Sequence, residues 1–191
     1  MRTDEELMEL FRKGSRDAFE TLFSRYHRKV IQFAFRMTGD RAKAEEAAQE
    51  TFLRVARAAS TWQPTARFST WLYTIARRTT LNYLRDEKEE GEKVPIPPGE
   101  ESADGSPAPQ IPGPTALHPE EIVWSAEIQE RFAAALVRLP ETYRAAFVLN
   151  RGDGLSYEEV ASVLGITVQA VKSRIFRAKE MLMGSLEEIL P

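Results

Sequence analysis

Apolar residues recur along the first 86 positions at the three- and four-residue spacing of an amphipathic helix. Four helices are predicted: Asp4, as cap, to about Gly14; Ser15, as cap, to Thr38; about 41–60, capped by Asp40; and about Ser69 to Asp86. The second carries the clearest pattern, with Ala18, Phe19, Leu22, Phe23, Tyr26, Val30, Ile31 and Ala34 at helical spacing. Residues 62–65 are expected to turn. The pattern therefore predicts a helical N-terminal domain over residues 1–86.

The C-terminal part shows the same helical spacing. Pro119 suits a first helical position, and a helix is expected from there to about Arg138. Further helices are predicted over about 141–151, over 157–164 and from Val168 to about Leu190. Ser156 and Glu159 have the spacing of a capping box. Because no segment alternates like a strand, we expect an all-α protein.

Between the two helical parts the composition changes. Eight of the eleven prolines lie between Pro95 and Pro119, and four glycines lie between positions 91 and 113. Proline disfavours both helix and sheet, and apolar residues are too few here to form a core. We therefore predict a flexible or extended linker over 87–117, which separates a domain over 1–86 from one over 118–191.

Composition excludes several kinds of chemistry. The chain has no cysteine and only two histidines, so disulfides, thiol catalysis and a thiolate or histidine metal site are not expected. The N-terminus lacks the apolar run of a signal peptide, and no apolar stretch approaches the ~20 residues that span a bilayer. We expect a cytoplasmic protein without membrane insertion, cofactor or metal.

The net charge of −3 conceals a strong asymmetry. Residues 1–85 carry 16 basic and 10 acidic side chains, whereas residues 86–121 carry 2 basic and 10 acidic ones. The acidic middle therefore hides a basic N-terminal part, which is the kind of distribution that indicates a nucleic-acid partner.

Residues 156–182 match the plan of a helix-turn-helix: a short capped helix, a turn that contains Gly165, and a longer helix. Val168, Val171, Ile175, Ala178 and Leu182 share one face of the last helix. The candidate DNA-binding residues lie away from that face or flank it: Gln169, Ala170, Lys172, Ser173, Arg174, Arg177 and Lys179. Arginine and glutamine suit base edges, and lysine suits phosphates. The alternative is an ordinary solvated helix.

Residues 51–85 contain six arginines, six aromatic residues and no acidic residue. Such a composition is typical of a surface that stacks single-stranded bases. On the fourth helix, Phe68, Leu72, Ile75, Thr79 and Tyr83 are expected inside, with Tyr73, Arg77, Leu81 and Leu84 on the far side. The alternative is that the aromatic residues belong to the core, which is expected of Phe52 and Phe68 but harder to accept for Trp62.

The third helix presents a candidate docking surface. Its inward face is predicted to be Ala44, Ala48, Thr51, Phe52, Val55 and Ala59. Leu53 lies opposite, surrounded by Glu46, Gln49, Glu50 and Arg57. A single exposed leucine is common, so this surface alone decides nothing.

Three segments together resemble a known family. EEAAQETFLRV (45–55) and RFSTWLYTIARRTTLNYLR (67–85) are similar to the core-binding and promoter-melting segment of extracytoplasmic-function sigma factors. LPETYRAAFVLNRGDGLSYEEVASVLGITVQAVKSRIFRAKEML (139–182) resembles their second domain. With residues 4–44, the similarity covers nearly all of the chain outside the linker.

The resemblance implies a non-enzymatic subunit of RNA polymerase that recognises promoters and assists DNA melting. The side formed by Glu46, Gln49, Glu50, Leu53 and Arg57 would dock on the beta-prime coiled coil, and the beta flap would be a second contact. The minus-ten strand would lie on Trp62, Arg67, Trp71, Thr74, Arg78, Asn82 and Arg85. The last helix would recognise the minus-thirty-five element, the linker would follow the RNA path, and an anti-sigma factor would mask these surfaces.

Other functions account for less of the sequence. A helix-turn-helix regulator that acts without polymerase would leave the arginine-aromatic segment unexplained, and an adaptor would leave both basic surfaces unexplained. An enzyme would need a phosphate loop, a nucleophile arrangement or a metal cluster, and the sequence suggests none. Asp153, between two glycines, looks like turn chemistry.

Overall fold

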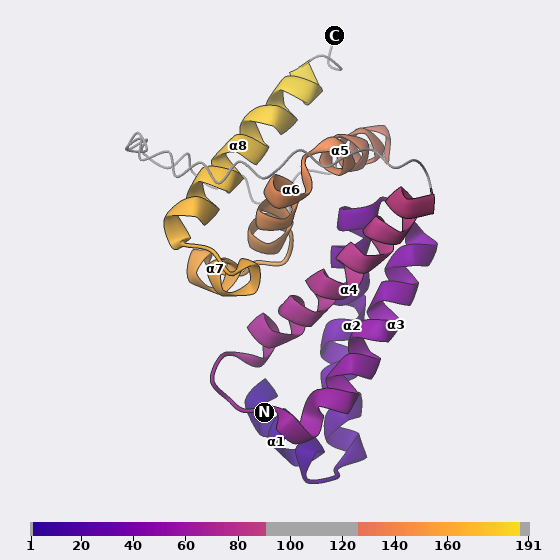
Figure 1. Ribbon diagram of the computed structural model, residues 1–191, viewed down its shortest axis with the longest axis vertical. Coiled ribbons are helices and arrows are strands. Elements are labelled where there is room, and N and C mark those ends of the chain that lie inside the picture. The colour runs from indigo at the N-terminus through magenta and orange to yellow at the C-terminus, as the bar shows by residue number, and fades with distance from the viewer. Residues whose placement is uncertain (1, 91–125, 188–191) are drawn as a thin grey trace.

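The computed structural model describes residues 2–90 and 126–187, and within these ranges the chain is helical with no strand. The first range holds α1 (Asp4–Arg12), α2 (Arg16–Thr38), α3 (Arg41–Ala58), a 3-10 turn (Ala59–Thr61) and α4 (Phe68–Glu90). The second holds α5 (Ala126–Arg138), α6 (Glu141–Phe147), a π-helical turn (Val148–Gly152), α7 (Tyr157–Leu164) and α8 (Val168–Glu187). Figure 1 shows the two groups lying against each other. The all-α prediction is confirmed.

The first group is built on α2, α3 and α4, which pack along one another, with α1 crossing their lower end in Figure 1. Phe33, Met37, Phe68 and Leu72 are fully buried between these helices. All six residues predicted for the inner face of α3 are buried, because a face spaced by three and four residues stays on one side of a helix. Asp40 caps α3 as expected: its carboxylate accepts the Lys43 N–H at 3.1 Å.

Several predicted boundaries were wrong by a few residues. Thr3, not Asp4, caps α1, through a reciprocal capping box with Glu6, and the Ser15 side chain makes no capping bond to α2. Helix α4 begins at Phe68 and continues four residues beyond Asp86, so positions 87–90 of the predicted linker are helical. The rest of that linker, the helix start predicted at Pro119 and residues 188–191 lie outside the described residues.

In the second group, α5, α6 and α7 pack around α8. The predicted capping box is present at α7, where Ser156 Oγ accepts the Glu159 N–H at 3.2 Å and Glu159 accepts the Ser156 N–H at 2.8 Å. Gly165 ends α7 with a φ of +68°, a left-handed conformation that glycine adopts without strain. The tight turn brings α8 back across α7.

The two groups form one continuous set of buried side chains. Helix α2 contacts α5, and α4 contacts α7. At one close approach Gly39 faces Val137, where an added Cβ would lie 2.9 Å from a Val137 methyl carbon. Gly39 also has a φ of +73°, so both its conformation and its small size suit this contact. The sequence had left open whether the two domains pack together, and in this structure they do.

Candidate nucleic-acid interface

The helix-turn-helix places its apolar residues as predicted. Val171, Ile175, Ala178 and Leu182 of α8 are buried and Val168 is half-buried, while Val160 and Ala161 of α7 close the small core between the two helices. The side chain of Thr167 accepts the Ala170 N–H at 3.1 Å at the start of α8. The first turns of α8 are thereby fixed relative to α7, as a helix that enters a groove requires.

The candidate residues on α8 are not equally accessible. Gln169, Lys172, Ser173 and Arg177 are exposed, whereas Ala170, Arg174 and Lys179 are half-buried. Lys172 lies over the Tyr157 ring, with its ammonium 5.7 Å from the ring centre. Arg177 pairs with Glu180 at 2.9 Å. The pKa of Lys179 is lowered from its ordinary value, mainly by burial and to a smaller extent by the neighbouring positive charge of Arg151. The accessible cations of α8 are therefore Lys172 and Arg177.

The arginine-aromatic segment 51–85 runs from α3 through the 3-10 turn and the following loop into α4. The expectation that Trp62 lies outside the core was wrong, because its side chain is only 5% exposed. The Trp62 ring packs edge-on against Trp71, with 6.4 Å between centroids, and Trp71 also contacts Phe68 at 6.0 Å. Trp71 is half-buried, so it is the more accessible of the two tryptophans.

The other candidates on this segment follow α4 along one side. Arg67, Arg78, Asn82 and Arg85 are exposed, and Thr74 is half-buried, with its hydroxyl donating to the Thr70 carbonyl at 2.8 Å. None of the five is buried, although the guanidinium of Arg67 is paired with Glu159 at 3.1 Å.

The side of α4 predicted to face away from the core is in fact covered. Tyr73 is 2% exposed and Leu81 is 8% exposed. Helix α4 packs on α2 and α3 on one side and on α7 on another, so it has buried residues around most of its circumference. A single amphipathic face, read from periodicity, could not include the second contact.

Within residues 2–90 and 126–187, three ion pairs join the domains, and in each the cation belongs to the first domain. Arg67 pairs with Glu159 at 3.1 Å, Arg77 with Glu141 at 3.4 Å, and Arg36 lies 3.6 Å from Asp153. Two of these arginines belong to the acid-free segment 51–85. Of the three, only Arg67 is a candidate DNA-binding residue, and in this arrangement it is occupied by Glu159 of the second domain.

Asp153 is the least accessible of these carboxylates, with a side chain 3% exposed. Burial raises its pKa to about 7, although Arg36, Tyr73 and Lys29 all favour the charged form. Among the described residues, Arg36 Nη1, the Tyr73 hydroxyl and Asp153 Oδ2 are buried without a hydrogen-bond partner. The interpretation of Asp153 as turn chemistry alone was incomplete, because its carboxylate lies in the domain interface.

The residues of the candidate docking surface lie on the outer side of α3. Leu53 is 51% exposed, and Glu46, Gln49 and Arg57 around it are exposed as well. Glu50 is half-buried and accepts a hydrogen bond from Arg54 at 2.7 Å. Within the described residues, α3 packs mainly on α2 and α4, and Leu53 stays exposed while the domains are packed.

Nothing in the described ranges suggests a metal site or a membrane span. Acidic and histidine side chains of residues 2–90 and 126–187 nowhere gather in threes as potential metal ligands. No helix in those ranges is long and apolar enough to cross a bilayer.

The chain matches two protein-family models and is similar in sequence to known proteins over nearly its whole length. Residues 22–90 match the family model of sigma-70 region 2, and residues 129–182 match that of sigma-70 region 4. The RNA polymerase sigma-H factor of Pseudomonas aeruginosa is 32% identical over 98% of this chain and 95% of its own. The ECF RNA polymerase sigma-E factor of Escherichia coli is 34% identical over 98% of this chain and 96% of its own. The chain belongs to the extracytoplasmic-function (ECF) sigma factors of the sigma-70 family.

Two solved structures share the fold of this sigma factor. CnrH in complex with the cytosolic domain of CnrY superposes with a TM-score of 0.72 at 23% identity, covering 98% of this chain and 99% of that one. The sigma factor RpoE of Bartonella quintana, in complex with the anti-sigma factor NepR, gives a TM-score of 0.64 at 23% identity, covering 88% and 96%.

The family assignment confirms the sequence prediction of an alternative sigma factor. Region 2 spans most of α2 together with all of α3 and α4, and region 4 spans most of α5, all of α6 and α7, and α8 as far as Leu182. Sequence reasoning missed Arg36, Tyr73 and Asp153 as interface residues. A signal was present for Asp153 alone, as a carboxylate between two glycines.

Proposed function

We propose that this sigma factor is a non-enzymatic subunit that binds core RNA polymerase, in the cytoplasm, and directs it to promoters. The observation that carries the proposal is that one chain presents two separate candidate DNA surfaces: the arginine-aromatic start of α4 and the exposed side of α8. A duplex-binding regulator needs only the second. The names of the two relatives, both RNA polymerase sigma factors, support the same partner.

Core polymerase would bind the α3 surface around Leu53, with Glu46, Gln49, Glu50 and Arg57 as its polar surround. An apolar anchor within a charged rim is the usual composition of a specific protein interface. We assign this surface to the beta-prime coiled coil and a further contact of the second domain to the beta flap. The α3 surface faces away from the second domain, so docking there does not require the domains to separate first.

The minus-ten strand would lie over the start of α4. Trp71 offers a half-buried ring on which a base can stack, and Arg67, Arg78 and Arg85 supply positive charge for phosphates. Thr74 and Asn82 add hydrogen-bonding groups between them. Trp62, being buried, would contribute by supporting Trp71 rather than by stacking on a base itself.

The minus-thirty-five element would be recognised by α8. Gln169, Ala170, Ser173, Arg174 and Arg177 would face base edges, and Lys172 and Lys179 would bind phosphates. Promoter DNA would therefore contact both domains of the chain.

Use of the minus-ten surface requires the domains to move apart near Arg67. Its guanidinium is held by Glu159 in the packed arrangement, and a phosphate and a carboxylate would compete for the same donors. We propose that polymerase binding separates the domains and that an anti-sigma factor holds them in a masked state. Two similar structures support this kind of partner: RpoE is in complex with the anti-sigma factor NepR, and CnrH is in complex with the cytosolic domain of CnrY.

Run-off transcription tests the proposal. Purified core polymerase and fragmented genomic DNA are incubated with and without this chain, and transcripts are mapped by their 5′ ends. Discrete transcripts that depend on the chain and share upstream elements are expected. Binding to duplex DNA without polymerase, together with no chain-dependent transcript, would contradict the proposal and indicate a conventional regulator.

A further inference from the structure

The N-terminus of α4 receives its hydrogen-bond acceptor from another helix. The first N–H groups of a helix have no partner within it and need an acceptor from outside. The residue before α4 is Arg67, whose guanidinium only donates, and no acidic residue lies in the first turn. The Phe68 N–H donates instead to Glu5 Oε1 of α1 at 2.8 Å, across 63 positions of sequence.

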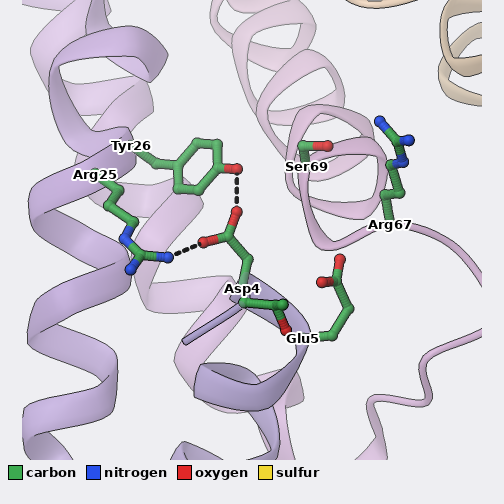
Figure 2. A pocket seen from close by; sticks show the side chains of 7 residues that line it. Asp4, Glu5, Arg25, Tyr26, Arg67 and Ser69 are labelled. Carbon is green, nitrogen blue, oxygen red and sulfur yellow. Dashed lines mark hydrogen bonds and ion pairs between the residues drawn. The ribbon is translucent and has the colours of Figure 1, made fainter. Parts of the chain in front are cut away.

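Glu5 is held in place by the residues beside it. The carboxylate of Asp4 accepts hydrogen bonds from Arg25 and from the Tyr26 hydroxyl, both on α2. The first turn of α1 is therefore fixed to α2, which directs the neighbouring Glu5 toward the start of α4. These side chains line an open pocket of about 420 Å³. Figure 2 shows Arg67 and Ser69 on the other side of this pocket.

The Phe68–Glu5 hydrogen bond lies directly beneath the candidate DNA-binding residues at the start of α4. Phe68 is fully buried, and its ring packs edge-on against Tyr26, with 5.5 Å between centroids. From this fixed point the chain continues to Trp71, whose N–H donates to the Arg67 carbonyl at 3.2 Å. The positions of Arg67 and Trp71 therefore depend on where the first residue of α4 is held.

The alternative use of this helix end is phosphate binding, since free N–H groups at a helix N-terminus attract anions. Glu5 already accepts the Phe68 N–H and adds a negative charge there, which repels a phosphate. Glu5 therefore contributes to DNA binding by fixing the start of α4, and it does not bind the DNA strand itself.

We propose that Glu5 is a positioning residue for promoter opening, which orients Arg67 and Trp71 toward the melted minus-ten strand by capping α4. The inference rests on the proposed function and adds a role for α1, a helix outside the region 2 match. It predicts that Glu5 matters for capturing the strand but not for binding core polymerase.

The experiment compares Glu5→Ala, Glu5→Asp and Glu5→Gln in the full chain assembled with core polymerase. Rates of open-complex formation are measured on a closed promoter and on the same promoter with a pre-opened minus-ten bubble, beside the affinity for core. Glu5→Ala should slow opening of the closed promoter by roughly three- to tenfold, the loss expected when a helix cap is removed. The effect on the bubble template should be clearly smaller, and core affinity should not change.

The other two variants separate the cap from the charge. Glu5→Asp keeps the charge and the first turn of α1 but is too short to reach Phe68, so it should behave like Glu5→Ala. Glu5→Gln keeps an amide oxygen at the same place and should recover most of the wild-type rate. Hydrogen exchange at the Phe68 amide should be faster in the Ala and Asp variants than in the Gln variant.

Glu9→Ala is the matched control. Glu9 lies on the same helix, and its ion pairs are with Arg12 and Lys13 at the end of that helix. The positioning role is refuted if Glu5→Ala opens promoters as fast as Glu9→Ala. It is also refuted if Glu5→Ala lowers the opening rate equally on both templates and weakens the affinity for core polymerase as well. Absence of promoter-specific transcription by the wild-type chain would refute the proposed function itself, which is a different result.

Discussion

Replacing Asp153 by asparagine should change how the stability of this sigma factor depends on pH. The carboxylate lies in the domain interface, 3.6 Å from Arg36, with its side chain 3% exposed. Burial raises its pKa from 3.8 to about 7, so the loss of hydration outweighs the attraction of Arg36. The packed chain therefore favours the protonated form of this side chain below about pH 7.

The sign and size of the effect follow from linkage. Because the pKa is higher in the folded chain than in the unfolded one, the stabilisation is complete below about pH 4 and is lost as the pH rises toward about 7. The difference between 3.8 and about 7 corresponds to roughly 4 kcal/mol in total. Between pH 5 and pH 8 the wild-type chain should lose roughly 2–3 kcal/mol relative to a chain that is neutral at this position.

Urea unfolding measures this directly. Free energies of unfolding of wild type and Asp153→Asn are determined at intervals from pH 5 to pH 8 by far-ultraviolet circular dichroism. The difference between the two proteins should grow with pH and level off above pH 7. Glu20→Gln, an exposed carboxylate on α2, serves as the control and should track the wild type. A difference that stays constant over this range would refute the reasoning, because Asp153 would then be ionised throughout or exposed.

Four further predictions concern the proposed interfaces. Leu53→Asp should weaken binding to core polymerase in a titration with labelled core while circular dichroism shows the helices intact, since the side chain is 51% exposed; unchanged affinity would remove α3 from the docking surface. Arg177→Ala should lose about 1–3 kcal/mol of binding free energy on a matched minus-thirty-five element, while Lys172→Ala should weaken binding to all sequences and lower its salt dependence. Equal effects of the two variants on matched and scrambled elements would refute the distinction in which Arg177 recognises bases and Lys172 binds phosphates. Trp71→Ala should reduce transcription from a closed duplex more than from a pre-opened template, and an equal loss on both would indicate a folding role. Exchange of residues 92–114 for a neutral Gly/Ser linker of equal length should preserve open-complex formation but alter abortive transcripts, and identical product profiles would make the segment a simple tether.

Much of the candidate site was predictable because it depends on local rules. The inner face of α3, the exposure of Leu53 and the buried stripe of α8 all follow from a spacing of three and four residues. The caps of α3 and α7 follow from side chains that bond N–H groups three residues ahead. Such features need only a few consecutive residues, so the sequence contains all the information that they require.

The remaining features depend on which surfaces meet. Tyr73 and Leu81 lie on a side of α4 that periodicity assigned to solvent, and the second domain covers it. Asp153 acquires its raised pKa only through burial in the contact between the domains, where Arg36 and Tyr73 partly oppose the shift. Glu5 reaches Phe68 across 63 positions. Contacts of this kind bury a second face, or supply a missing acceptor, from a distant part of the chain. The sequence by itself determined the helices, their inward faces and the family, whereas only the tertiary structure decided which faces are covered twice and which charges are buried.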